Sequence, residues 1–139
     1  MQDKLHDVQM NEVKVFDEWV KKFFLNPETS KLDHQLFTID IYESDDEYMV
    51  EAILENHEAK DIKVRLIDNE ILIIVEKPHK PFQKLFHKDK AITPPTQRKI
   101  SFPFSICSRR ITAEFTHPTL VIRIHKYSPG KDQDSIQIE

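Results

Sequence analysis

Hydrophobic residues recur with a helical period near the amino terminus of this chain. Residues 12–25 read EVKVFDEWVKKFFL, and their apolar side chains return every three or four positions while lysines and glutamates fill most of the other face. This pattern predicts a short amphipathic helix with Asn11 as its N-cap, ended by Asn26 and Pro27. Since a polar stretch follows, we expect residues 1–36 to form an N-terminal arm outside the main core.

From residue 37 onward the hydrophobic period changes to two, which is the period of a half-buried strand. Short segments rich in β-branched residues show it at residues 37–43, 48–54, 61–67, 71–77, 98–104, 111–115 and 119–126. Almost no helical pattern separates them. They predict an all-β fold, an immunoglobulin-like antiparallel β-sandwich, over residues 37–126. The prolines agree, because they lie outside these segments or near their ends.

The last residues, 127–139, include proline, glycine and charged side chains and predict a flexible C-terminal tail. The tail closes with Ile136 and Ile138, which point to the same side if the segment is extended. The ten residues from Lys126 to Ser135 reach at most about 33–36 Å, enough to contact another subunit. A final edge strand on its own domain is the alternative interpretation.

Residues 78–97 form a long segment without a strand or helix pattern. A loop of this length in a small domain needs a function, and Phe82, Leu85 and Phe86 are too apolar for a loop that contacts only water. Residues 77–99 hold seven lysines and arginines against one acid, so a nucleic-acid-binding patch is one interpretation. The formal net charge of −4 and the lack of a recognised nucleic-acid module argue against it.

Composition narrows the function further. Hydrophobic residues make up 39% of the chain and charged residues 32%, which is typical of a soluble globular protein without a general affinity for nucleic acid or membrane. We expect no signal peptide and no membrane span, and the single Cys107 fits a reducing, cytoplasmic location. A single glycine argues against phosphate-binding loops and dinucleotide folds, so we expect no cofactor.

The polar residues show no pattern of a catalytic or metal site. The seven histidines are scattered without the spacing of zinc ligands. The acidic residues 45–47 lie in a turn and lack the alternating oxygen ligands and the glycine of a calcium loop. No nucleophile elbow is present. We therefore expect that the protein binds no metal and has no enzymatic activity.

Taken in order, these segments resemble the small heat shock proteins, which join a variable arm, an α-crystallin sandwich domain and a tail with an Ile-x-Ile motif. The resemblance covers residues 37–138. AKDIKVRLIDNEILIIVEK is similar to the second pair of strands, and RKISFPF is similar to the Arg-x-Phe-x-Leu-Pro signature, with Arg98 and Pro103 in place. His117, Pro118 and Thr119 replace the usual Asn-Gly-Val, so that turn must be of a different type.

The resemblance implies two kinds of contact between subunits. The tail would dock through Ile136 and Ile138 into a groove on a neighbouring subunit. That groove would be lined by six residues of two strands: Ile62, Val64, Leu66, Ile111, Ala113 and Phe115. The long loop would carry a strand that is exchanged into a partner's sheet. A homodimer interface would then contain Phe82, Leu85, Phe86 and Arg98, the last as an ion-pair partner.

The function that the resemblance implies is ATP-independent holding of unfolding proteins by a homo-oligomer built from dimers. Client-binding residues would come from the apolar face of the arm: Phe16, Trp19, Val20, Phe23 and Phe24. The arm sequence FDEWVKKFF, followed by Asn-Pro, looks most like family members of bacterial spore coats, so a structural role in a spore coat is the first alternative. A β-sandwich adaptor that binds peptides by strand addition is the second.

Overall fold

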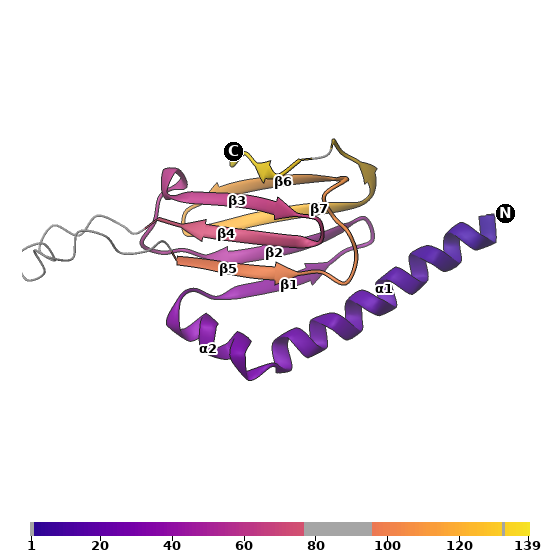
Figure 1. Cartoon of the computed structure of the whole chain (residues 1–139), viewed down its shortest axis with the longest axis horizontal. Helices are drawn as coiled ribbons and strands as arrows, with labels where there is room; N and C mark the ends of the chain where they lie inside the picture. Colours follow the sequence, from indigo (N-terminus) through magenta and orange to yellow (C-terminus); the bar gives the residue numbers. More distant parts are fainter. Residues whose placement is uncertain (1, 77–95, 132) are drawn as a thin grey trace, which may run out of the picture.

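Two helices and then eight strands make up the described chain (Figure 1). The computed structural model describes residues 2–76, 96–131 and 133–139, with side chains from residue 11 onward. The elements are α1 (Gln2–Leu25), α2 (Pro27–Gln35), β1 (Ile39–Glu43), β2 (Glu47–Ile53), a 3-10 turn (Ala59–Asp61), β3 (Ile62–Ile67), β4 (Glu70–Val75), β5 (Thr96–Ser101), β6 (Arg109–Thr116), β7 (Thr119–Pro129) and β8 (Ser135–Ile136).

The strands form two four-stranded antiparallel sheets that pack face to face, which confirms the predicted all-β sandwich. One sheet has the order β1-β2-β7-β6 and the other β5-β4-β3-β8. Side chains alternate between the core and solvent, as the period of two predicts. In β3, for example, Ile62, Val64 and Leu66 are buried while the residues between them are exposed.

Helix α1 differs from the prediction at its start and agrees at its end. It begins at Gln2 rather than at residue 12, so Asn11 lies inside the helix and is not its N-cap. The preceding residues contain no glycine or proline, and a polar residue alone does not start a helix. The helix ends at Leu25, where Asn26 accepts a hydrogen bond from the backbone of Glu28 and caps α2 instead.

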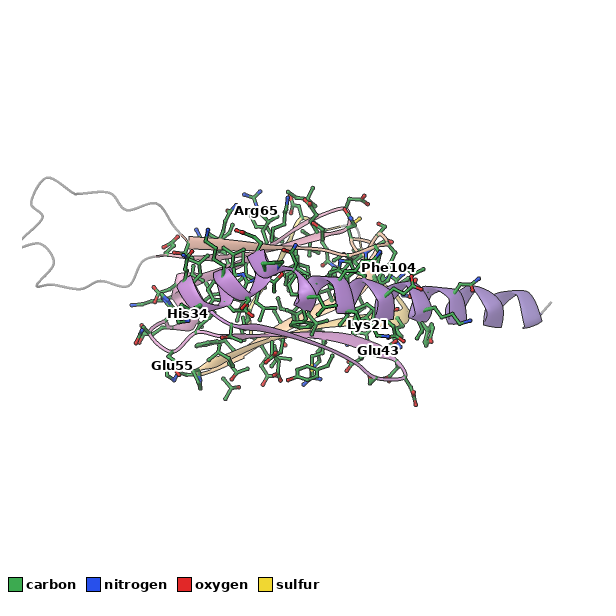
Figure 2. The ribbon with its side chains drawn as sticks, turned by 90° about the horizontal axis from the view of Figure 1, so that it is seen from below. Lys21, His34, Glu43, Glu55, Arg65 and Phe104 are labelled. Carbon is green, nitrogen blue, oxygen red and sulfur yellow. The ribbon has the colours of Figure 1, made fainter. Side chains whose placement is uncertain are left out.

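The arm does not lie outside the core, so that expectation was wrong. Phe16 is only 2% exposed and belongs to the main hydrophobic cluster, against which Trp19, Val20 and Phe23 also pack. Figure 1 shows both helices along the side of the sandwich where β1 and β5 lie, with the start of α1 projecting past the sheets. Seen from that side, the helices run along the line between the two sheets (Figure 2). An amphipathic helix buries its apolar face wherever a matching surface is open, and the edge of the sandwich supplies one.

The C-terminal segment covers the opposite side of the sandwich. Strand β7 continues to Pro129, three residues beyond the predicted end of the domain at residue 126. The chain then turns back, and β8 pairs with β3 while Ile138 forms a bridge to Ala113 of β6. Both open sides of the sandwich are thus covered by terminal segments of the same chain. None of the helices in the described part of the chain has the length and apolar character needed to span a membrane.

Candidate interaction sites

The first candidate site is the tail groove, which we define as the space between the edges of β3 and β6. Its walls contain the six residues predicted for it: Ile62, Val64, Leu66, Ile111, Ala113 and Phe115. All but Phe115 are buried, each with 7% or less of its surface exposed. The walls thus form a continuous apolar surface between the edges of two strands, which is the kind of site that an added strand recognises.

The tail occupies this groove in its own chain. Ile136 is opposite Val64 in the β3–β8 ladder, and the backbone N–H of Leu66 donates to the carbonyl of Asp134 over 2.9 Å. On the β6 side, the N–H of Glu139 donates to the carbonyl of Ala113 over 3.0 Å, and Ile138 packs against the core. The tail therefore joins the two sheets. The structure places both isoleucines on the strands predicted to receive them, and their docking onto a neighbouring subunit stays a prediction.

The link to the tail is shorter than the sequence suggested. Because β7 runs to Pro129, only residues 130–134 connect it to β8. Five extended residues span at most about 17–18 Å, half the reach expected from ten. A tail that docks onto another subunit without a change in β7 must find its groove within that reach.

The second candidate site is the aromatic cradle, which we define as Tyr48 of β2 together with Phe102 and Phe104 from the β5–β6 loop. Phe16 of α1 inserts into it, with ring centres 4.3 Å from Tyr48 and 6.5 Å from each phenylalanine. Trp19 stacks beside it, 4.9 Å from the ring of Phe102. Aromatic pairs at these separations stabilise beyond the area that they bury, so the cradle fixes the position of α1.

The turn between β3 and β4 holds the loop that carries the cradle. Asn69 binds the backbone of Phe102 twice: its carbonyl accepts from the N–H over 2.8 Å, and its side-chain amide donates to the carbonyl over 2.7 Å. The carbonyl of Asp68 accepts from the N–H of Ile106 over 3.0 Å, and Asp68 itself has a positive φ of 51°. Asparagine and aspartate tolerate such turns well, so these two residues position the loop.

Glu12 of α1 lies beside the cradle as its polar anchor. Its carboxylate forms an ion pair with Arg109 of β6, whose second guanidinium nitrogen donates over 3.0 Å, and it accepts from the Tyr48 hydroxyl over 2.7 Å. The guanidinium carbon lies 4.7 Å from the centre of the Phe104 ring. Two-point binding of a carboxylate by arginine is directional as well as strong, so it fixes both the rotation of α1 and its position along its axis.

The surroundings change the acid–base behaviour of these groups. Burial by itself raises the pKa of Glu12, but the hydrogen bonds from Arg109 and Tyr48 and the positive charges of Arg109 and Lys126 outweigh it and lower the pKa. Burial and the hydrogen bond to Glu12 raise the pKa of Tyr48 well above its ordinary value. Tyr48 is therefore a hydroxyl donor, and Glu12 an ionised acceptor, at neutral pH.

A second ion pair holds α2 on the sandwich. Arg98 of β5 is 4% exposed, pairs with Asp33 of α2 and donates to the carbonyl of Phe37 over 2.7 Å. The same carboxylate accepts from the N–H of Ile39 over 3.2 Å. Arg98 was predicted to pair with an acid across a dimer interface, and in the structure the acid belongs to its own chain. Its position at a dimer interface stays a prediction.

The predicted client-binding residues have different environments. Phe16 is buried, while Trp19, Val20 and Phe23 are partly buried and Phe24 is 39% exposed. The predicted dimer residues Phe82, Leu85 and Phe86 lie outside the described residues.

The residues that hold the arm on the sandwich were not among the predicted site residues: Glu12, Asp33, Tyr48, Phe102, Phe104 and Arg109. One signal was available. Glu12 precedes Phe16 by four positions and Trp19 by seven, so it is an acid on the apolar face of the predicted helix. An acid in that position indicates a basic partner on the surface that the helix covers.

The comparison with family models decides the family. The model of the Hsp20/alpha crystallin family matches residues 40–139. The chain belongs to this family. The match includes both sheets and the tail and begins after α1 and α2. Its first residue lies in β1, so α1 and α2 precede the matched region.

Two relatives and one solved structure show what the chain is similar to. The chain is 33% identical to small heat shock protein C2 of Rickettsia felis over 121 residues, which cover 84% of this chain and 78% of the relative. It is 24% identical to spore coat protein M of Bacillus subtilis over 127 residues, 91% of this chain and 85% of that protein. The fold is similar to that of the Del-C4 mutant of hsp14.1 from Sulfolobus solfatataricus P2, with a TM-score of 0.52, 23% identity and coverage of 84% of this chain and 95% of that chain.

Proposed function

We propose that this protein is an ATP-independent holdase, which binds apolar segments of unfolding proteins and keeps them from aggregating. Membership of the small heat shock protein family supports this function. The observation that carries it is that the sandwich has two apolar surfaces, and a terminal segment of the chain covers each of them. A surface of this kind is protected from self-association at rest and available for clients when the segment leaves.

The tail groove also supports assembly. A groove that accepts the chain's own Ile136 and Ile138 presents the same strand edges to the tail of another copy. Two buried isoleucines contribute about 3–6 kcal/mol before ordering costs, so one tail binds weakly and many tails bind firmly together. We propose homodimers joined through the long loop, with Phe82, Leu85 and Phe86 at the interface, and higher homo-oligomers joined through tails. This function needs no cofactor and no catalytic residue, and its proposed location is the cytoplasm.

A light-scattering assay tests the proposal. A heat-labile client such as citrate synthase is warmed with the full-length protein, without nucleotide, at one to four subunits per client. The expected result is suppressed scattering with the client recovered in a soluble complex of high mass. Bovine serum albumin at equal mass is the control for non-specific crowding. Scattering equal to that of the albumin sample at every ratio would exclude the holdase function.

A structural role in a spore coat is the second candidate function. The similarity to spore coat protein M, which extends over 91% of this chain, favours it. The same tail and loop contacts would then build a permanent layer rather than an exchangeable oligomer. Fractionation of sporulating cells separates the two functions: a coat protein is extracted from purified spore coats by detergent and reductant, whereas a holdase stays in the soluble fraction of stressed cells.

A further inference from the structure

We propose that the aromatic cradle is a helix-binding site of the sandwich and that α1 is its intramolecular ligand. In this proposal the cradle takes client segments of one chemistry: an amphipathic helical segment with an acidic residue four positions before one aromatic side chain and seven before another. The inference rests on the proposed holdase function and specifies where, and by which pattern, a client is recognised. The site is on the β1–β5 side of the molecule, opposite the tail groove (Figure 1).

The aromatic contacts define the apolar part of the pattern. Phe16 is the only residue of α1, among those with described side chains, that is fully buried, and it contacts all three rings of the cradle. Trp19 adds the second contact three positions later, on Phe102. An aromatic anchor in a pocket with a second aromatic at its rim is the arrangement that concentrates binding energy at protein interfaces.

The charge of Arg109 defines the polar part. Its guanidinium is mostly buried and has the Phe104 ring on one face, so a ligand without an acid would leave a buried positive charge without its partner. The Tyr48 hydroxyl next to it likewise requires an acceptor. Lys126, 5.0 Å from the centre of the Tyr48 ring, is paired with Glu43 over 2.7 Å and adds to the positive potential. The cradle therefore selects a helix whose acid precedes its aromatic residues.

The way α1 is attached makes it a removable occupant. It is joined to α2 at Asn26, a cap residue with extended φ and ψ angles, while α2 has its own anchor in the Asp33–Arg98 ion pair. Around the anchors, several of the described side chains of α1 face solvent: Val15 is 44% exposed and Leu25 81%. Release of α1 therefore costs the burial of Phe16, the partial burial of Trp19, Val20 and Phe23, and the ion pair and hydrogen bond of Glu12. Because α2 keeps its own ion pair, we expect it to stay on the sandwich.

Fluorescence anisotropy with a labelled peptide tests the site directly. The probe is a fluorescein-labelled peptide with the sequence of residues 11–25, and the receptor is the full-length chain carrying Glu12→Gln and Phe16→Ala. Both substitutions lie in α1, so the sandwich keeps its own sequence while its tethered ligand is weakened. Since a tethered segment competes at an effective concentration near millimolar, we expect the double variant to bind the peptide about tenfold or more tighter than the wild-type chain.

Matched variants separate specific from general binding. The receptor with Val15→Ala and Glu18→Gln, two exposed positions of the same helix, should bind the peptide like the wild-type chain. Adding Arg109→Gln to the weakened receptor should reduce its affinity for the peptide about tenfold, as expected for loss of a partly buried ion pair. A peptide that carries both substitutions at positions 12 and 16 should not compete. Circular dichroism and the thermal transition confirm that each receptor is folded.

Three outcomes would overturn the inference. Equal peptide affinity for the double variant and the wild-type chain would mean that α1 does not cover a binding site. Binding that does not depend on Arg109 would mean that the cradle is not the receptor. If the double variant differs from the wild-type chain in oligomer mass but binds no labelled peptide, the ligand of the cradle is the α1 of a second copy. Since the peptide assay uses no client, specific peptide binding by a chain that fails the light-scattering assay would exclude the holdase function and retain the helix-binding site.

Discussion

Glu12 and Arg109 are 97 positions apart in the sequence, and their side chains form a two-point ion pair that joins the N-terminal helix to the first residue of β6. The pair lies beside the aromatic cradle, so the same small area of the sandwich provides the apolar and the charged contact of the arm. The position of the arm is therefore set by both the apolar packing of Phe16 and the directional ion pair of Glu12.

The first prediction is that docking of the arm depends on pH. The pKa of Glu12 is lowered in the folded chain, so the ionised carboxylate stabilises docking above its ordinary pKa of 4.5 and this stabilisation is lost as the pH falls through the lowered value. The charged and titratable groups around it are Arg109, Tyr48, Lys126 and Glu43. Trp19 is the only tryptophan and reports on docking. We expect constant Trp19 emission from pH 8 to about pH 5 and a shift to longer wavelength below that.

The Glu12→Gln variant serves as the control for this titration. It should emit at longer wavelength than the wild-type chain already at pH 7, and its emission should no longer change before global unfolding, which far-UV circular dichroism follows. If the variant and the wild-type chain give the same emission profile with pH, the Glu12–Arg109 pair does not hold the arm.

The second prediction concerns the ion pair below α2. Asp33→Asn keeps an oxygen for the backbone of Ile39 but leaves the buried Arg98 without an acidic partner. We expect the free energy of unfolding in urea to fall by about 3 kcal/mol, the cost of breaking a buried pair from one side. Asp17→Asn, at an exposed acid of α1, should change it by less than about 0.5 kcal/mol.

A double-mutant cycle decides whether the two residues interact. Arg98→Met combined with Asp33→Asn should cost less than the sum of the single substitutions, because no charge is then left buried. Additive costs would show that Asp33 and Arg98 stabilise the chain independently. All variants are compared at one protein concentration, since assembly contributes to apparent stability.

The strands could be predicted from the sequence, and the position of the arm could not. Alternation of apolar and polar residues depends only on the pleat of a strand and on one buried face, so β3, with Ile62, Val64 and Leu66 directed inward, is evident locally. The apolar face of α1 shows that the helix covers something but does not identify the surface. The partner residues Tyr48, Phe102 and Arg109 come together only when the two sheets pack.

The candidate tail groove was predictable for a different reason. Its residues follow from the strand pattern and the family resemblance together, and the structure places Ile136 against Val64 and Ile138 against Ala113. Which chain supplies the tail is not encoded in that pattern, because a groove recognises alternating apolar side chains and strand edges whatever their origin. In the structure the tail occupies the groove of its own chain, through a connection whose length depends on where β7 ends.

The third prediction concerns Gly130, the only glycine of the chain. A Cβ atom at this position would lie 2.6 Å from the carbonyl oxygen of Arg109 and 2.8 Å from its carbonyl carbon. The Gly130 N–H donates to the carbonyl of Ser108 over 2.7 Å, which holds the two backbone segments together. Because the obstructing atoms are backbone, Gly130→Ala must displace the start of β6. We expect a loss of about 1–3 kcal/mol in unfolding free energy and a shift of Trp19 emission to longer wavelength, since Arg109 moves.

Lys131→Ala is the matched control, since it changes the neighbouring exposed residue without adding an atom near β6. It should leave both the unfolding free energy and the emission unchanged. A Gly130→Ala variant that is as stable as the wild-type chain would contradict the close approach of the two backbone segments.

The fourth prediction concerns the tail. Replacing Ile136 and Ile138 with alanine removes most of the apolar contact in the tail groove, at about 2 kcal/mol or more for the buried Ile136 and less for the partly buried Ile138. Because every subunit contributes a tail, we expect the oligomer to dissociate to dimers, which size-exclusion chromatography with light scattering measures as mass. Gln137→Ala, at the exposed residue between them, should keep the wild-type mass. A wild-type mass with a lower melting temperature would mean that the tail serves only its own domain.

The most direct test is the client assay with the Glu12→Gln variant, because this substitution removes the charge that pairs with Arg109 and changes no aromatic residue. At a temperature where the wild-type chain only partly suppresses scattering of a heat-labile client, the variant should suppress it at a lower ratio of subunits to client. The Glu18→Gln variant should behave like the wild-type chain. If Glu12→Gln shifts the emission of Trp19 to longer wavelength, and so has released the arm, but suppresses scattering no better than Glu18→Gln, the claim that α1 covers a client-binding surface is wrong.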